Sequence, residues 1–76
     1  MDDATLRQKV IAQLDRQPLT LPSLINVIVH DGTVELWGMI DSESERRAVR
    51  VAAEVTPGVR AVADNLIVRP IKYGYQ

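Results

Sequence analysis

The dipeptide Asp31-Gly32, set between two runs rich in β-branched residues, restricts the fold of this chain more than any other feature. A two-residue type I′ turn needs positive φ at both central positions, and Asp-Gly suits it because glycine has no Cβ. Apolar and polar side chains alternate on both sides of the pair, which is the period of a β-strand. The pattern therefore predicts a hairpin with Asp31 and Gly32 as its loop.

A two-residue loop also sets which residues of the two strands face each other. The predicted pairs are His30–Thr33, Val29–Val34, Ile28–Glu35, Val27–Leu36 and Asn26–Trp37. One face of the hairpin then carries Ile25, Val27, Val29, Val34 and Leu36. We expect this face to form the core, because a slip of one residue would turn all of these side chains to the solvent.

Helical periodicity precedes and follows the hairpin. Asp2 or Asp3 can cap a first helix. Its apolar residues recur at three- and four-residue spacing: Leu6, Val10, Ile11 and Leu14. Ser42 and Glu45 form the capping box of a second helix, which Pro57-Gly58 ends. We expect its inner face to consist of Ala48, Val51, Ala52 and Val55, with Val49 at the edge.

Residues 59–69 alternate again and predict a third strand, with Val62, Leu66 and Val68 on one face. A strand–helix–strand connection within one sheet is almost always a right-handed parallel crossover. The predicted fold is therefore α+β with the order αββαβ. Its three-stranded mixed sheet has the order 1-2-3, strands 2 and 3 are parallel, and both helices pack on one face. We expect one domain over residues 1–76, with a core at about 3–69 and a tail at 70–76, and the chain is short enough to be a piece of a longer protein.

Composition and charge exclude several classes of function. The chain has 76 residues, no cysteine and a formal net charge of −1. A disulfide framework and a thiolate metal site are excluded, and no overall positive field draws the chain to nucleic acid. No apolar run approaches the roughly 18 residues of a membrane span.

The polar residues do not form a recognisable catalytic set. His30 is the only histidine, while the neighbouring Asp31 and Glu35 are explained by the turn and by an exposed strand position. The remaining acidic pairs lie at helix N-termini, where carboxylates are favourable. The glycines lack the spacing of a nucleotide-binding loop. We therefore predict a protein that is not an enzyme and has no cofactor or metal.

Two surfaces remain as candidate binding sites. The sheet face opposite the helices should carry Ile28, Trp37 and Ile67, extended by Met39, and such apolar patches are often interfaces. The alternative is that the tail, with its two tyrosines Tyr73 and Tyr75, covers this face.

The second surface is a group of arginines, which could meet anionic lipid headgroups. It consists of Arg46, Arg47, Arg50 and Arg60. The alternative is a solvated helix face on which Glu43 pairs with Arg47 and Glu54 with Arg50.

Four stretches of the chain together resemble the BON domain. They are Val27–Gly38, Ser42–Ala48, Pro57–Val62 and Asn65–Val68, and the resemblance extends from about Asp3 to Val68. The chain looks most like the BON domains that follow paired CBS domains in cytoplasmic bacterial proteins. The resemblance implies an accessory module without catalytic activity, from a family thought to bind phospholipid or other partners.

The combined hypothesis is a non-catalytic interaction module that contacts a protein partner through the open sheet face around Trp37. The partner is either a second copy or an adjacent domain of a parent chain. The alternative function is binding of anionic phospholipid headgroups through the arginines of the second helix. We expect a cytoplasmic location, and a periplasmic one stays open if a signal peptide was removed with the rest of a parent chain.

Overall fold

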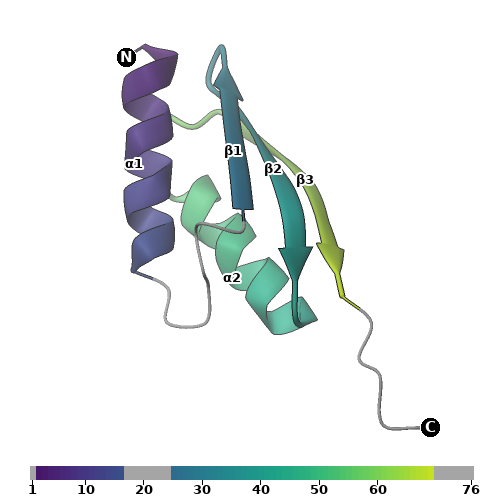
Figure 1. Cartoon of the computed structure of the whole chain (residues 1–76). Helices are drawn as coiled ribbons and strands as arrows, with labels where there is room; N and C mark the ends of the chain where they lie inside the picture. The colour runs from purple at the N-terminus through teal and green to yellow at the C-terminus, as the bar shows by residue number, and fades with distance from the viewer. Residues whose placement is uncertain (1, 17–24, 70–76) are drawn as a thin grey trace, which may run out of the picture.

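The computed structural model describes residues 2–16 and 25–69 (Figure 1). The elements are α1 (Asp3–Asp15), β1 (Ile25–His30), β2 (Thr33–Ile40), α2 (Glu43–Glu54) and β3 (Ala61–Val68). This order confirms the predicted αββαβ arrangement. The predicted tail, with the two tyrosines expected to cover the sheet, lies outside the described residues.

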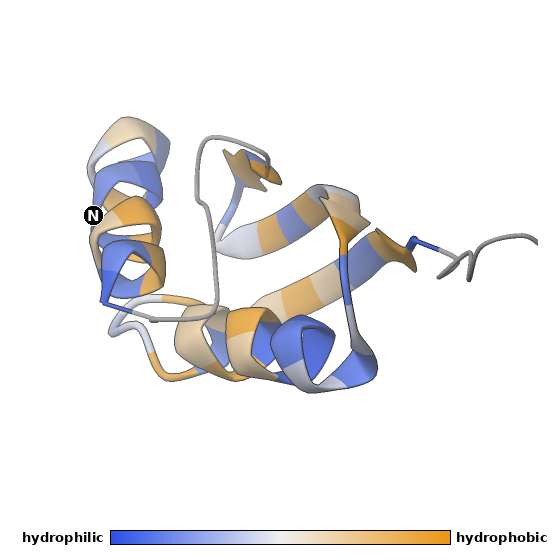
Figure 2. Ribbon diagram, turned by 60° about the horizontal axis from the view of Figure 1, so that its bottom comes forward, coloured by the Kyte–Doolittle hydropathy of each residue, from blue (hydrophilic) through white to orange (hydrophobic). Residues whose placement is uncertain are grey.

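The sheet has the predicted topology, with strand order β1-β2-β3. Strands β1 and β2 are antiparallel, and every predicted hairpin pair is present, from Asn26–Trp37 to His30–Thr33. Strands β2 and β3 are parallel over eight pairs that begin at Thr33–Ala61. The crossover through α2 leaves both helices against the same face of the sheet (Figures 1 and 2).

Both helices begin with a side-chain cap. Asp2 caps α1, its Oδ1 accepting a hydrogen bond from the Thr5 N–H at 2.7 Å. Ser42 caps α2, its Oγ accepting from the Glu45 N–H at 3.1 Å. The Glu45 carboxylate reaches back to the Asp41 N–H at 2.8 Å, one residue earlier than in the usual capping box. Each cap satisfies backbone donors that the first turn of a helix leaves unpaired.

The core lies between the helices and the inner face of the sheet. Most of the strand residues expected from the alternation are buried, but Val29, Val62 and Val68 are only partly so, and Ile40 is an additional core residue. The largest fully buried side chains are Leu14, Leu36, Val10, Val34 and Val49. Because each buried Val or Leu contributes roughly 1.5–3 kcal/mol, this layer is the main source of stability.

The predicted inner face of α2 was wrong in part. Val51 and Val55 are 44% and 62% exposed, whereas Val49 and Ala53 are completely buried. The helix is rotated about its axis relative to the expectation, and Glu45 is on its buried face. This rotation brings the flank with Arg46 against β3, a contact that helical periodicity alone could not reveal.

The hairpin turn requires glycine for two reasons. Asp31 and Gly32 have φ of 52° and 79°, the left-handed values that a type I′ turn needs. In addition, a Cβ on Gly32 would lie 2.7 Å from Cδ of Arg60. The Arg60 N–H donates to the Gly32 carbonyl at 2.8 Å, so the close approach is part of how β3 begins.

Gly32→Val should therefore destabilise the domain by about 1–3 kcal/mol, which lowers the melting temperature by on the order of 10 °C in a domain of this size. Thermal unfolding followed by circular dichroism measures the shift. Asp31→Gly is the matched control, since glycine adopts positive φ without strain, and its midpoint should stay close to that of the wild type. A Gly32→Val protein as stable as the wild type would contradict the turn geometry.

Candidate interaction surface

The face of the sheet turned away from the helices, called here the open sheet face, carries four large exposed hydrophobic side chains. They are Ile28 (47% exposed), Trp37 (44%), Met39 (48%) and Ile67 (60%). All four lie at strand positions that alternate with the buried ones. The described structure therefore brings the four predicted contact residues to one face.

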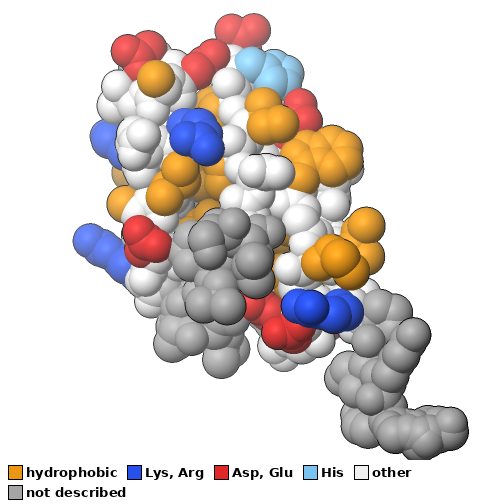
Figure 3. Space-filling model, in the orientation of Figure 1, with side chains coloured by type: hydrophobic (Ala, Val, Ile, Leu, Met, Phe, Trp, Pro, Cys, Tyr) orange, Lys and Arg blue, Asp and Glu red, His pale blue; other side chains and the backbone are white. Residues whose placement is uncertain are grey.

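Strand register decides how these side chains are distributed. Trp37 lies between Asn26 on β1 and Asn65 on β3, whereas Met39 is directly beside Ile67. Ile67 is therefore diagonal to Trp37, two residues further along β3 than Asn65. Figure 3 accordingly shows the hydrophobic side chains over the strands in separate groups, with other side chains between them.

Glu35 connects the tryptophan to the only histidine of the chain. Its Oε1 accepts a hydrogen bond from Trp37 Nε1 at 3.0 Å, and its Oε2 lies 3.0 Å from His30 Nε2. The three residues share the open sheet face near the hairpin turn. The contact with Glu35 satisfies the indole N–H, so Trp37 offers chiefly apolar ring surface to a partner.

Strand alternation places His30, Glu35 and Trp37 on one face, but the sequence interpretation did not group them and treated Glu35 as an ordinary exposed residue. Two signals could have identified the contact. Glu35 and Trp37 are two residues apart on one strand, and His30 is diagonal to Glu35 across the predicted pairs. Diagonal neighbours of this kind are within reach of long side chains.

The same contacts shift the pKa values of the two titratable partners in opposite directions. The hydrogen bond with Glu35 raises the pKa of His30 above its ordinary 6.5. The hydrogen bond from His30, followed by that from Trp37, lowers the pKa of Glu35 below its ordinary 4.5. Protonated His30 therefore stabilises the fold below pH 6.5, and this stabilisation is lost as the pH rises through the raised pKa of His30. Ionised Glu35 stabilises the fold above pH 4.5, and this stabilisation is lost as the pH falls through the lowered pKa of Glu35.

Two of the four arginines of the alternative site form ion pairs. Arg46 Nε is 3.0 Å from Asp64 Oδ2 on β3, and its Nη1 is 3.6 Å from Glu43 Oε2. The predicted Arg50–Glu54 pair is present at 4.0 Å. Glu43 lies next to Arg46 instead of pairing with Arg47 as expected.

Arg60 follows α2 in the chain, and its side-chain stem lies beside Gly32 in the hairpin turn. Neighbouring carboxylates therefore compensate the charges of Arg46 and Arg50.

Asp64 is the residue of this region that the sequence interpretation missed. Its side chain is only 12% exposed, at an inward strand position between Val62 and Leu66. Its Oδ1 accepts from the Leu66 N–H at 3.0 Å, while Oδ2 contacts Arg46. A carboxylate at an inward strand position was the available signal, because buried charges are normally paired.

Within residues 2–16 and 25–69, no three His, Cys, Asp or Glu side chains come together as metal ligands would. In the same part of the chain, no helix has the length and apolar character needed to cross a membrane.

Comparison with known families agrees with the fold. A family model of the BON domain matches residues 2–70. The chain belongs to the BON domain family. The fold is also similar to the C-terminal domain of CdsD, described as the structural protein of the type III secretion system of Chlamydia trachomatis. The TM-score is 0.69 at 18% sequence identity, covering 92% of this chain and 35% of that one. No curated protein gives a significant sequence match.

The contact between His30 and Glu35 can be tested by titration. We expect the pKa of His30, measured from its ring proton signals by NMR, to lie above 6.5. Glu35→Gln should lower it, because the neutral amide no longer favours the charged imidazole. Asp31→Asn is the control, since Asp31 acts on His30 only through a weaker charge effect. A titration midpoint that is the same in the wild type and in Glu35→Gln would refute the contact.

The pairing of Arg46 with Asp64 distinguishes this arginine from its neighbour. Arg46→Gln should destabilise the domain by about 1–2 kcal/mol, because it leaves a nearly buried carboxylate with fewer partners. Arg47→Gln removes the same charge at an exposed position, and its free energy of unfolding should stay within about 0.5 kcal/mol of the wild type. Urea unfolding curves measure both, and equal midpoints for the two variants would contradict the Arg46–Asp64 contact.

Proposed function

We propose that this BON domain is a non-catalytic accessory module that contacts a protein partner through the open sheet face around Trp37. The observation that carries the proposal is the exposure of Trp37, with its indole N–H already bonded to Glu35. The indole ring is therefore held in place with its apolar surface available for contact.

The surroundings of Trp37 resemble those of interface anchors in general. Tryptophan is enriched among the few residues that contribute most of the energy of protein interfaces. Apolar groups lie diagonal to it at Ile28 and Ile67, and the exposed residues Asn26 and Asn65 flank it directly. An apolar anchor surrounded by hydrogen-bonding groups is the usual composition of a specific, non-obligate interface.

The family and fold comparisons support a role as an accessory module. The BON match covers nearly the whole chain. The similar fold of the CdsD domain comes from a protein described as structural. We propose that the partner is a second copy or an adjacent domain of a parent chain, such as the paired CBS domains, in the cytoplasm.

Binding of anionic phospholipid through Arg46, Arg47, Arg50 and Arg60 is the alternative, and the geometry favours it less. Each basic residue near an anionic membrane contributes about 1 kcal/mol when its charge is free to act. Arg46 and Arg50 already have carboxylate partners, and Arg60 is directed to the hairpin turn. In the described structure the apolar side chains of the open sheet face are, in contrast, exposed.

A photo-reactive amino acid placed at Asn65, which is exposed and directly beside Trp37, tests the contact in cells that naturally make the protein. We expect a protein adduct of defined mass that disappears when Trp37→Ser is added. The same probe at the exposed position Arg47 on α2 is the matched control and should give no such adduct.

Trp37→Ser should lower stability by clearly less than the roughly 3 kcal/mol typical of a truncated core residue, so that loss of the adduct does not reflect unfolding. Absence of a protein adduct at position 65, together with sedimentation on phosphatidylglycerol vesicles that is present at low salt and lost at higher salt, would replace the proposal with the lipid alternative.

A further inference from the structure

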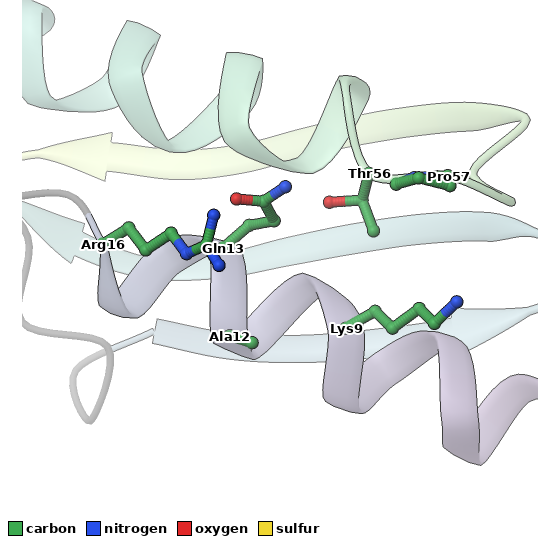
Figure 4. Close-up of a pocket in the computed structure, with 6 residues that line it drawn as sticks. All are labelled: Lys9, Ala12, Gln13, Arg16, Thr56 and Pro57. Atoms are coloured by element: carbon green, nitrogen blue, oxygen red, sulfur yellow. The ribbon is translucent and has the colours of Figure 1, made fainter.

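A groove of ≈ 260 Å³ lies between α1 and the residues that follow α2 (Figure 4). One wall consists of α1 residues and the other of Thr56 and Pro57. The α1 residues are Lys9, Ala12, Gln13 and Arg16. The groove belongs to the helical layer, so it is separate from the open sheet face.

The middle of the groove is suited to an apolar side chain. The backbone next to it is held in place, because Thr56 is only 2% exposed and its hydroxyl donates to the Ala52 carbonyl at 2.8 Å. Ala12 and Pro57 add small apolar surfaces on opposite walls. Figure 4 shows Gln13 and Thr56 directed toward each other across the groove.

Both charged residues that line the groove are basic. Lys9 and Arg16 are seven residues apart, which is about 10 Å along a helix. In the described part of the chain Arg46, Arg50 and Arg69 have carboxylate partners, but no ion pair involves Lys9 or Arg16. Residues 17–24 and 70–76 contain no Asp or Glu that could supply one.

The remaining acids do not cancel this charge within the groove. Asp15 is the last residue of α1 but does not line the groove, because consecutive helix positions are rotated by about 100°. A smaller hollow elsewhere is lined by both Glu54 and Arg60 and so has no single sign of charge. The groove between the helices therefore combines apolar surface with uncompensated positive charge.

We propose that this groove binds an acidic amphipathic helix of a partner protein. On such a helix, two carboxylates seven residues apart match the spacing of Lys9 and Arg16, and an apolar side chain between them lies over Ala12 and Pro57. A lipid surface fits less well, because two cations give weak headgroup attraction and a flat membrane does not fill a groove.

The test is a titration of the ¹⁵N-labelled protein with a synthetic helical peptide that carries two glutamates seven residues apart and a leucine midway. We expect amide shifts at Ala12, Gln13 and Thr56, while the indole N–H signal of Trp37 stays in place. A peptide with glutamine at both glutamate positions should bind about tenfold more weakly, because two surface ion pairs are lost.

Two sets of variants make the result specific. Lys9→Gln with Arg16→Gln should weaken binding of the acidic peptide about tenfold, whereas Arg47→Gln with Arg60→Gln changes the net charge equally and should leave it unchanged. Ala12→Glu places a carboxylate between the two cations and should abolish binding. Its melting temperature should stay near that of the wild type, since glutamate is also a good helix former.

Several outcomes would overturn the proposal. They are absence of shifts at millimolar peptide, equal binding of the glutamate and glutamine peptides, and equal effects of the two double variants. Perturbation of the groove amides by phosphatidylglycerol vesicles but not by the peptide would assign the groove to a membrane surface. Shifts centred on Trp37 would also overturn it, while supporting the open sheet face as the binding site.

Discussion

The core face and the open sheet face of this domain both depend on the turn at Asp31 and Gly32. Positive φ at both residues joins β1 and β2 with no extra residue, which sets every pair of the hairpin. Because side chains alternate along a strand, this one register sends Val34 and Leu36 into the core and Trp37 to the solvent. The Gly32 carbonyl also accepts a hydrogen bond from the N–H of Arg60, the residue just before β3, so the third strand is linked to the same turn.

The polar contacts of the domain have different consequences on its two faces. On the open sheet face Glu35 accepts a hydrogen bond from the indole N–H of Trp37, while the indole ring stays partly exposed. Such a ring favours a partner that offers apolar surface. On the helical side, the pair Arg46–Asp64 attaches α2 to β3 and removes a positive charge from the surface. Arg46 of α2 therefore contributes to the fold, whereas in the described part of the chain no ion pair involves Lys9 or Arg16 of α1.

The two surfaces that we propose as binding sites lie on opposite sides of the sheet. In this proposal Trp37 would provide affinity by burial of apolar surface, whereas the cationic groove would provide selectivity for acidic partners. The two surfaces share no residue, so changes at one can be examined without altering the other.

The sequence by itself determined the order of elements, the hairpin pairs, the parallel third strand and the residues of the open sheet face, because these follow from local turn chemistry and from the period of the side chains. It did not determine the rotation of α2, and so Val51 and Val55 were wrongly assigned to the core. Helix periodicity defines a broad arc, and only packing against β3 decides which part of that arc is buried.

The groove between α1 and the end of α2, the contact of Arg46 with Asp64 and the position of Ile67 beside Met39 were decided by the tertiary structure alone. Each of them joins residues far apart in the chain, whose distance depends on how helices and strands pack and not on any local preference.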